Sequence, residues 1–277
     1  PGDILHFTVR EGPRTVIDEV RFLGSEPLTP DNLREVLALH EGAPAPAELN
    51  SYGQDIYRMR SLYWDRGNLR VRIRPEVEIT ATPDGSRYVA VVTYRIEPGP
   101  TYTCSAISIS GNSRTQTALI TRELTIEPEE RFAWSQVELS RQNLLATSLF
   151  RDVTMRPTAW DTLAARAALQ IQVTERRPRF LEFGFGIGSR ERVRVQLAWG
   201  HNNLWGTGRR VQARVRTFWN AEDILGETRN VGDGELNARG DLFYRNPHVF
   251  GTSYPFDFNL FGRYETRGES ALIQRLA

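Results

Sequence analysis

The chain has 277 residues, of which 40% are hydrophobic and 25% are charged, so it is long enough for two or three small domains and too apolar to be disordered. Its 35 basic and 34 acidic residues give a formal net charge of +1, which offers no reason to expect nucleic acid as a partner. No run of about 18 apolar residues occurs, which excludes a hydrophobic membrane-spanning helix. The single cysteine, Cys104, cannot form an intrachain disulfide and is predicted to be a buried, unreactive thiol.

An internal repeat covers the first 180 residues. Gly12-Pro13 recurs as Gly99-Pro100, and Ser61-Leu62-Tyr63 recurs as Ser148-Leu149-Phe150, in both cases 87 residues later. Further positions share this offset: Val20, Phe22, Gly24, Leu33, Leu37 and Leu39 correspond to Ile107, Ile109, Gly111, Ile120, Leu124 and Ile126. A fixed offset through both loops and periodic segments indicates a duplicated domain.

Each copy of the repeat predicts the same order of elements: strand, helix, helix, strand, strand. The first strand of each copy alternates apolar and polar residues and ends at a glycine, Gly24 or Gly111. The first helix is predicted to begin at Thr29-Pro30, with the threonine as N-cap and the proline at the first helical position. The second helices are predicted near residues 50–64 and 133–149, and the closing strands near 69–80, 88–96, 151–158 and 168–174, with a turn at Asp84-Gly85.

The β-α-α-β-β order, the Val-x-Phe-x-Gly end of the first strand and the Gly-Pro joint resemble the periplasmic POTRA domain. The resemblance covers residues 14–178, and it implies one POTRA domain at 14–100 and a second at 101–178. Residues 4–9 predict a strand, so residues 1–13 are expected to be the last strand of a preceding POTRA domain. The alternative is a pair of generic α+β domains that arose by duplication.

The last 100 residues lose the helical pattern and alternate strictly between apolar and polar positions. Residues 181–187 place leucine, phenylalanine and isoleucine at every second position, with glutamate and glycine between them. Stretches with the same period predict four more strands, near residues 193–200, 211–216, 236–245 and 256–261. Strands of about nine or ten residues cross a bilayer when tilted, with one apolar face toward lipid. Residues 179–277 are therefore predicted to be the N-terminal part of an outer-membrane β-barrel. This part would contain about five strands, so the barrel would be incomplete.

Connection lengths and aromatic residues are also typical of such a barrel. A tight turn is predicted around Trp205-Gly206-Thr207-Gly208, a long polar loop at 221–234 and a shorter connection at 246–251. Aromatic residues near the strand ends fit interfacial girdles; they are Trp199, Trp205, Phe218, Trp219, Tyr244, Phe250 and Tyr254. A soluble β-sandwich is the alternative, although its polar faces would point to bulk water and its strands are usually shorter.

The most specific resemblance lies at the start of the predicted barrel. The glycine-rich stretch from Phe183 to Gly188, followed by His201-Asn202-Asn203-Leu204-Trp205-Gly206-Thr207-Gly208, closely resembles the barrel start of the BamA/TamA family. Asn246-Pro247 resembles a further turn of that family. The fold class is then α+β POTRA repeats followed by the first antiparallel strands of a transmembrane β-barrel. The resemblance implies a bacterial outer-membrane protein, with periplasmic POTRA domains, that receives unfolded β-barrel clients and helps to insert them.

Partners follow from the same resemblance. Those implied are unfolded outer-membrane protein clients and outer-membrane lipids, with accessory lipoproteins or an inner-membrane partner; nucleic acid is not among them. No cofactor and no enzyme activity are implied. Three other functions stay open: a two-partner-type secretion porin for one dedicated protein substrate, a passive outer-membrane channel or surface anchor, and an enzyme joined to a barrel through an upstream domain.

Two strands are candidates for holding a client, because a strand entering lipid needs partners for its backbone. An edge strand of the second POTRA domain would bind an extended client by β-augmentation; its residues are Arg151, Asp152, Val153, Thr154, Met155 and Arg156. The first barrel strand contains glycines that weaken it, and the family resemblance implies a lateral gate there; its residues are Phe183, Gly184, Phe185, Gly186, Ile187 and Gly188. Alternatively, these glycines only relieve crowding inside the barrel.

Two further sets of residues complete the candidate sites. The predicted periplasmic turn comprises Asn203, Leu204, Trp205, Gly206 and Gly208. Four arginines on the polar face of the strands are expected to point into the barrel; they are Arg194, Arg214, Arg216 and Arg239. They either line a wet cavity or form a basic patch that contacts a lid loop or a client.

The sequence offers no catalytic or metal-binding pattern. Gly184-x-Gly186-x-Gly188 lacks the third-glycine spacing, the following helix and the ribose-binding acid of a nucleotide loop. The four histidines, His6, His40, His201 and His248, are scattered without the spacing of metal ligands. Acid pairs such as Glu129-Glu130 are expected to be solvated. The expected site is therefore a surface for polypeptide and lipid.

Overall fold

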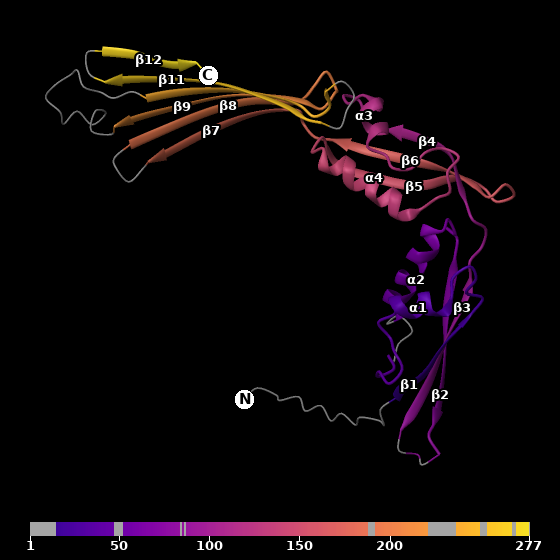
Figure 1. Cartoon of the computed structure of the whole chain (residues 1–277). Helices are drawn as coiled ribbons and strands as arrows, with labels where there is room; N and C mark the ends of the chain where they lie inside the picture. The colour runs from indigo at the N-terminus through magenta and orange to yellow at the C-terminus, as the bar shows by residue number, and fades with distance from the viewer. Residues whose placement is uncertain are drawn as a thin grey trace, which may run out of the picture. The chain divides into compact units, whose positions relative to one another are not determined.

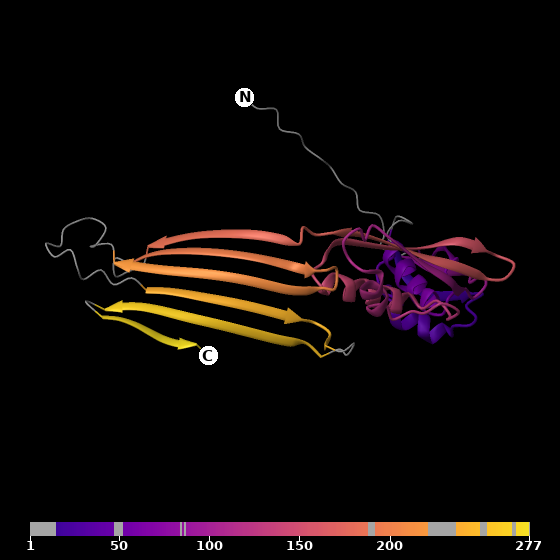
Figure 2. The same cartoon turned by 90° about the horizontal axis from the view of Figure 1, so that it is seen from above.

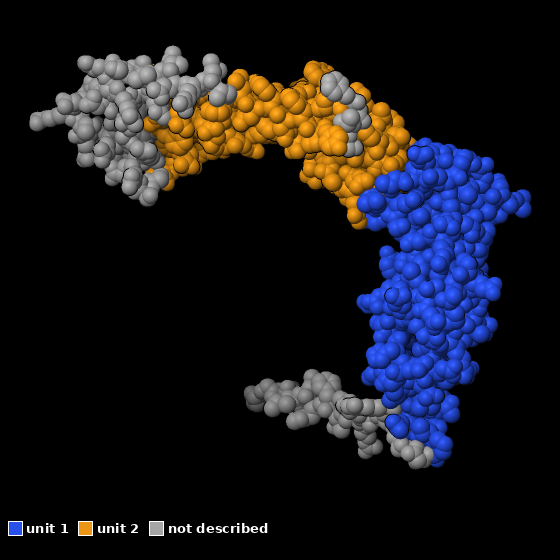
Figure 3. All heavy atoms as spheres, viewed as in Figure 1, with its two compact units in different colours: residues 1–108, 125–139, 156–169 blue, residues 109–124, 140–155, 170–277 orange. Residues whose placement is uncertain are grey.

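The structure is a computed structural model of the chain, and it describes residues 15–46, 52–83, 85, 87–187, 192–220, 237–249, 254–267 and 270–276. The strand expected at 4–9, the loop expected at 221–234, Asp84 and Gly188 lie outside the described residues. The described strands form three β-sheets (Figure 1). The chain divides into two compact units, one of residues 1–108, 125–139 and 156–169, the other of residues 109–124, 140–155 and 170–277 (Figure 3).

The first module lies in the first compact unit and has the predicted order of elements. These are β1 (Thr15–Leu23), α1 (Pro30–Val36), α2 (Gly53–Asp65), β2 (Arg72–Ala81) and β3 (Tyr88–Glu97). The sheet order is β1-β3-β2, with β1 parallel and β2 antiparallel to the central strand β3. The parallel pair requires a crossover, which the two helices provide. The module is thus an α+β unit built around a three-stranded sheet.

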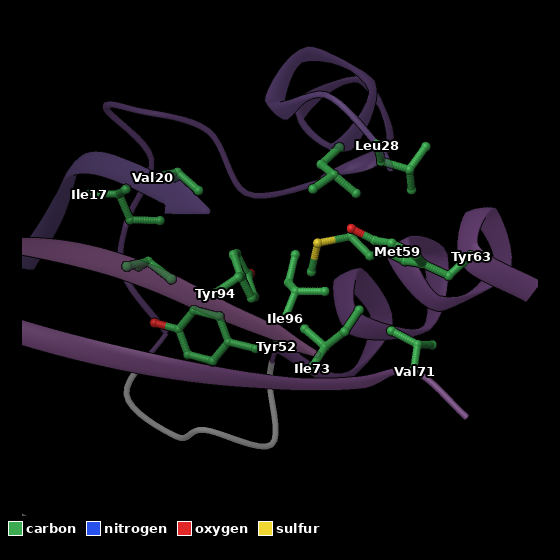
Figure 4. Packing of buried hydrophobic residues seen from close by; sticks show 12 residues of the cluster. Ile17, Val20, Leu28, Tyr52, Met59, Tyr63, Val71, Ile73, Tyr94 and Ile96 are labelled. Atoms are coloured by element: carbon green, nitrogen blue, oxygen red, sulfur yellow. The ribbon is translucent and has the colours of Figure 1, made fainter. Parts of the chain in front are cut away.

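The core of the first module joins alternate residues of β3 to one face of α2 (Figure 4). Val92, Tyr94 and Ile96 are buried because every second residue of a strand points to the same face of the sheet. Met59 and Tyr63, four residues apart on α2, meet them, and the Tyr63 hydroxyl donates a hydrogen bond of 2.6 Å to the Ser25 carbonyl. One face of β3 and one face of α2 therefore form the core of the first module.

Local polar contacts fix the helices of the first module. Thr29 caps α1 as predicted, since its hydroxyl accepts a hydrogen bond from the Asn32 amide while the Asn32 side chain bonds the Thr29 amide. Asp55 is buried, and its carboxylate accepts hydrogen bonds from the amides of Ala38 at 2.8 Å and Leu39 at 3.1 Å. This carboxylate ties the segment after α1 to the start of α2.

The second module repeats the first. Its elements are β4 (Thr103–Ser110), α3 (Thr117–Arg122), α4 (Trp134–Ala146), β5 (Phe150–Asp161) and β6 (Arg166–Glu175), and the sheet order β4-β6-β5 matches β1-β3-β2. The repeated glycines after the first strands, Gly24 and Gly111, both have positive φ, and a Cβ there would lie 2.4 Å and 2.0 Å from a strand carbonyl oxygen. Among the described helices, none is long and apolar enough to cross a membrane.

The third sheet contains six antiparallel strands in chain order (Figure 2). They are β7 (Arg179–Ile187), β8 (Arg192–Leu204), β9 (Arg209–Asn220), β10 (Asn237–Asn246), β11 (Phe256–Arg267) and β12 (Ser270–Leu276). The sequence predicts about five strands and misses β12. The reason is local, because the apolar run Ala271-Leu272-Ile273 breaks the alternation by which the other strands are recognised.

Candidate functional site

One edge of each α+β sheet is covered by a following segment of the chain. In the first module, the Ile17 amide donates to the Ala43 carbonyl and the Ala45 amide donates to the Thr15 carbonyl, both at 2.9 Å. In the second module, the Cys104 amide donates to the Glu130 carbonyl at 2.7 Å. The sheet order leaves β2 and β5 as the opposite edges. A strand could therefore be added at β2 or β5 without displacing these covering segments.

The residues predicted to bind a client, 151–156, lie in β5 at this edge. Val153 and Met155 are buried, whereas Arg151, Asp152 and Arg156 are exposed. Pro157 follows directly and has no backbone N–H to offer. A client could therefore contact the backbone and the charged side chains of this stretch, because its apolar side chains already belong to the core.

Five of the six predicted gate residues, 183–187, lie in β7, and Gly188 lies outside the described residues; among the described strands, β7 is the outermost of the third sheet and is paired with β8. A Cβ added at Gly184 would make an ordinary contact of 3.6 Å with the Gln196 Cβ, and one added at Gly186 would meet no described atom within 4 Å. Crowding within the described part of the sheet therefore does not require glycine at either position. Glycine within a strand lowers the stability of that strand.

A different glycine of this sheet does make room for a side chain. Phe180 and Gly200 are direct partners in the β7–β8 register, and a Cβ at Gly200 would lie 2.4 Å from the Phe180 ring. Gly200 therefore lets the aromatic ring cover the neighbouring backbone. The sequence analysis did not single out this pair, because only the register brings the two residues together.

One face of the third sheet is apolar and exposed. On β7, Phe183 and Ile187 are each 73% exposed, and register pairs such as Leu181 with Trp199 and Phe185 with Val195 continue the face across β8. It extends to β11 through exposed residues of the same parity: Leu197, Val215, Leu242, Phe256, Phe258, Leu260 and Tyr264. A contiguous apolar face of this kind marks contact with a membrane or a partner rather than with water.

The predicted periplasmic turn is held against the second module. The buried Asn203 side chain donates a hydrogen bond of 2.9 Å to the Thr115 hydroxyl and accepts one of 2.8 Å from the Gly208 amide. The Gln116 amide donates to the Gly206 carbonyl, and the Gln116 side chain donates to the carbonyl of Trp205, both at 3.0 Å. The turn and the segment before α3 therefore form one hydrogen-bonded joint.

Gly206 is required in this joint for two reasons. Its φ is +74°, and a Cβ there would lie 2.4 Å from the Arg114 carbonyl oxygen. Any larger residue would be strained and would push the turn away from the module. Leu204 and Trp205 contribute differently: Leu204 ends β8 and pairs with Arg209, while the Trp205 side chain is 72% exposed.

The Glu175 carboxylate fixes the module side of the joint. It accepts hydrogen bonds from the Ser113 hydroxyl at 3.1 Å, the Arg114 amide at 3.0 Å and the Thr115 amide at 2.6 Å. Burial opposes ionisation, but hydrogen bonds from Thr115, Arg114 and Ser113 outweigh it and lower the pKa of the Glu175 carboxyl below its ordinary 4.5. Nothing in the sequence around Glu175 signals this role.

A second connection of the third sheet also meets the second module. The Arg210 guanidinium donates a hydrogen bond of 2.6 Å to the Thr147 carbonyl after α4, and His248 Nε2 lies 3.4 Å from the Glu123 carboxylate after α3. These groups border a cavity of about 440 Å³ between the module and the residues Gly208, Pro247, His248 and Pro255. The cavity is lined by Leu119, Glu123, Asn143, Ala146, Thr147, Ser148, Leu149, Gly208, Arg210, Arg245, Pro247, His248 and Pro255.

The four predicted lumen-facing arginines share the face of the sheet opposite to the apolar one. Arg216 is paired directly with Arg239 across β9 and β10, and Arg214 is paired with Asp241. Asp241 bridges the cluster, with its carboxylate 2.8 Å from Arg216 and 2.9 Å from Arg239. Arg194 stacks over the Phe218 ring, 5.0 Å from its centroid. Asp241 belongs to this cluster although it is not one of the predicted lumen-facing residues.

The described residues contain no cluster of three or more histidine, cysteine or acidic side chains that could hold a metal ion. Cys104 is buried and free, as predicted, and burial raises the pKa of its thiol. Glu129 is exposed, as expected, and contacts Arg166. The chemistry on this surface consists of strand edges, an apolar face and guanidinium groups.

Known proteins share this arrangement. The chain is 25% identical over 248 residues to outer membrane protein assembly factor BamA of Neorickettsia risticii, which covers 88% of the chain. It is 24% identical over 248 residues to BamA of Nitratidesulfovibrio vulgaris, which covers 87% of the chain. The crystal structure of Haemophilus ducreyi BamA lacking POTRA domains 1–3 covers 90% of the chain with a TM-score of 0.68 at 16% identity. The resemblance to the BamA/TamA family is confirmed.

The BamA relatives are longer than this chain, which spans 32% and 30% of the two curated proteins and 43% of the H. ducreyi structure. No family model matches the chain. Both curated BamA relatives are named outer membrane protein assembly factors. The BamA likeness therefore runs through the α+β modules and into the third sheet, which is where the candidate surfaces lie.

Proposed function

We propose that this chain is the part of an outer-membrane protein assembly factor in which POTRA domains lead into the first strands of a transmembrane β-barrel. One observation carries the proposal: an antiparallel sheet with one large, exposed apolar face directly follows two α+β modules. A bilayer removes such a face from water, while the opposite polar face lines an aqueous lumen. The protein lies in the bacterial outer membrane, with the POTRA domains in the periplasm.

The proposal assigns the POTRA domains to residues 14–100 and 101–178 and the barrel part to residues 179–277. Residues 1–13 then belong to a preceding POTRA domain. The partners are unfolded outer-membrane protein clients and outer-membrane lipids, with accessory lipoproteins or an inner-membrane protein. In this proposal, insertion of a client depends on strand pairing and burial of apolar surface, and it involves no covalent chemistry, cofactor or metal.

Two strands would act in succession on a client. An unpaired backbone group costs several kcal/mol in lipid, so an entering strand needs a partner at every stage. The edge of β5, at residues 151–156, would first hold the client as an added strand in the periplasm. The glycine-containing strand β7 would then open from its neighbour in the closed barrel and offer its edge within the membrane, at residues 183–188.

The test uses the full-length parent protein in liposomes with an added unfolded outer-membrane β-barrel protein. One cysteine in β7, at Phe185, and one in the last barrel strand would be joined by a disulfide, in a background where the buried Cys104 is replaced by alanine. The expected result is faster client insertion with the reduced protein and loss of that acceleration when the disulfide forms. A matched control places the cysteine pair within β9 and β10, at Val215 and Gly240, which are already paired.

Each outcome separates one function from another. Acceleration that survives the disulfide would support assembly but remove the gate at β7. No acceleration, together with ion conductance, would overturn the assembly function in favour of a secretion porin or a passive channel. Inhibition by the control disulfide as well would mean that general stiffness of the barrel, rather than opening at β7, limits insertion.

A further inference from the structure

The polar face of the third sheet carries a row of arginines on β9 and β10, interrupted by the pair Gln212 and Phe243. We call this row the arginine track; it comprises Arg210, Arg214, Arg216, Arg239 and Arg245. Arg216 is directly opposite Arg239, and Arg210 is directly opposite Arg245, so their side chains share a face. Arg214 lies on that face too, because it is two residues from Arg216 on the same strand.

The positive charge of the track is only partly compensated. Asp241 contacts Arg216 and Arg239, and Asp257 lies 3.2 Å from Arg245. Five guanidinium groups and two carboxylates leave a charge of +3 on this strip. The Nε atoms of Arg214 and Arg216 are buried without a hydrogen-bond partner among the described residues, although a guanidinium normally uses its donors. The strip therefore presents donors suited to an anion.

The track begins at an aqueous opening. Arg210 and Arg245 line the cavity of about 440 Å³ beside the second module, and Arg214 and Arg216 continue along β9 from there. The basic residues of the whole sequence are all arginine, and arginine stays protonated under all physiological conditions. A solute passing from the cavity along this face would meet guanidinium groups at Arg210 and Arg245 and, beyond the Gln212–Phe243 pair, again at Arg214, Arg216 and Arg239.

We propose that the arginine track makes the lumen of the parent barrel selective for small anions over cations. This inference rests on the proposed function in one respect, namely that the sheet is part of a closed barrel whose polar face is the lumen. Arginine rings and strips select anions because fixed positive charge in a confined, low-dielectric setting attracts anions and repels cations. Arg214 is the position to test, because the carboxylate of its register partner Asp241 contacts Arg216 and Arg239.

The test measures the reversal potential of the full-length parent protein in a planar lipid bilayer under a potassium chloride gradient. Wild-type protein is expected to show a reversal potential of the sign set by chloride. Arg214→Gln should move it toward zero, and Arg214→Glu should move it further in the same direction. Arg209→Gln is the matched control, because it removes the same charge from the same strand at a position of opposite parity; it should leave the potential unchanged.

The outcomes are distinct. A protein that does not conduct, or that prefers potassium, overturns the inference. An anion preference that is equal in wild type, Arg214→Gln and Arg214→Glu overturns the role of the track. Client insertion measured on the same preparations separates the two proposals: insertion with a potassium-preferring pore leaves the proposed function standing, and chloride selectivity without insertion leaves only this inference standing.

Discussion

At the scale of single residues, Asn203 shows how a buried amide can hold two segments together. Its side chain bonds both Thr115 and the Gly208 amide, so Asn203→Ala would leave a buried donor and a buried acceptor without their partner. A lost pair of this kind costs about 1–3 kcal/mol. We expect faster hydrogen exchange at residues 206–208 in the full-length protein, measured by mass spectrometry. Asn202→Ala, one residue away and less buried, should exchange as wild type does. Equal exchange in both variants would contradict the role of Asn203.

Glu175 gives the same joint a pH dependence. The pKa of its carboxyl is lowered in the folded protein, so its contribution to stability is present above the ordinary pKa of 4.5 and is lost as pH falls through the lowered folded value. The protection factor of the amides at residues 113–116, which is the intrinsic exchange rate at each pH divided by the observed rate, should therefore fall on acidification in the wild type. Glu175→Gln should already exchange faster at neutral pH, by roughly fivefold for a loss of about 1 kcal/mol, and should respond less to acid. An unchanged acid response in Glu175→Gln would assign the pH dependence to another group.

The sequence predicts one side of this joint and misses the other. The Asn-Leu-Trp-Gly-Thr-Gly stretch is a recognisable turn, because glycine at Gly206 and Gly208 permits positive φ. Thr115 and Glu175 have no comparable signal. Thr115 bonds Asn203 of the turn, which is 88 residues away along the chain. Glu175 bonds the Thr115 amide, which is 60 residues away. Periodicity reports which face of an element is buried, and it does not report which polar group will be opposite.

Among the elements, β7 is distinguished from the other strands of the third sheet by two glycines, Gly184 and Gly186, and not by its sequence period. Its glycines weaken it by about 0.5–1 kcal/mol each relative to alanine, and Gly184 and Gly186 both have room for a side chain. We expect the double variant Gly184→Val with Gly186→Val to strengthen the strand and to slow client insertion by the full-length protein, roughly tenfold if opening of β7 limits the rate. Gly240→Val is the control, because it also has space but lies in a strand paired on both sides. Equal slowing by the control would remove the special role of β7.

The edge strand β5 can be tested with a photo-crosslinking amino acid. Asp152 is exposed and lies on the edge strand, whereas Gln172 is exposed on the central strand β6 of the same sheet. A client added at the edge should be captured from position 152 during insertion and much less from position 172, since β6 already has partners on both sides. The measurement is the yield of crosslinked client by gel electrophoresis. Similar yields at both positions would indicate contact with side chains over the face of the sheet instead of pairing at its edge.

Elements are where sequence reasoning succeeds most. The fixed offset of the repeat predicts two modules of the same order, and both have sheets of matching strand order. Strict alternation predicts β7 through β11, since a sheet with one apolar face must place alike residues at every second position. The strand β12 is missed because its apolar residues are adjacent, and the covering of the β1 and β4 edges is missed because it is made by backbone groups of irregular segments.

At the scale of the whole molecule, the two kinds of sheet have opposite relations to water. The α+β modules contain cores of fully buried large side chains, such as Tyr94 and Phe150, whereas the third sheet exposes Phe183, Phe185 and Ile187 at more than 60% each. The same chain thus contains α+β modules whose cores are shielded from water and a third sheet whose apolar face is not. The proposed assembly function would use both parts, because a client would be received in water and released into lipid.

This contrast makes a prediction about fragments of the chain. Residues 14–178 expressed alone should be soluble without detergent, whereas residues 180–277 should aggregate unless detergent covers the apolar face and the open edges. The measurement is size-exclusion chromatography with light scattering, with and without detergent. A matched control replaces Phe183, Phe185 and Ile187 by serine in residues 180–277, which should reduce the need for detergent if the apolar face is its cause. A monomeric, detergent-free 180–277 fragment would count against a membrane-facing sheet, and it would favour the soluble sandwich instead.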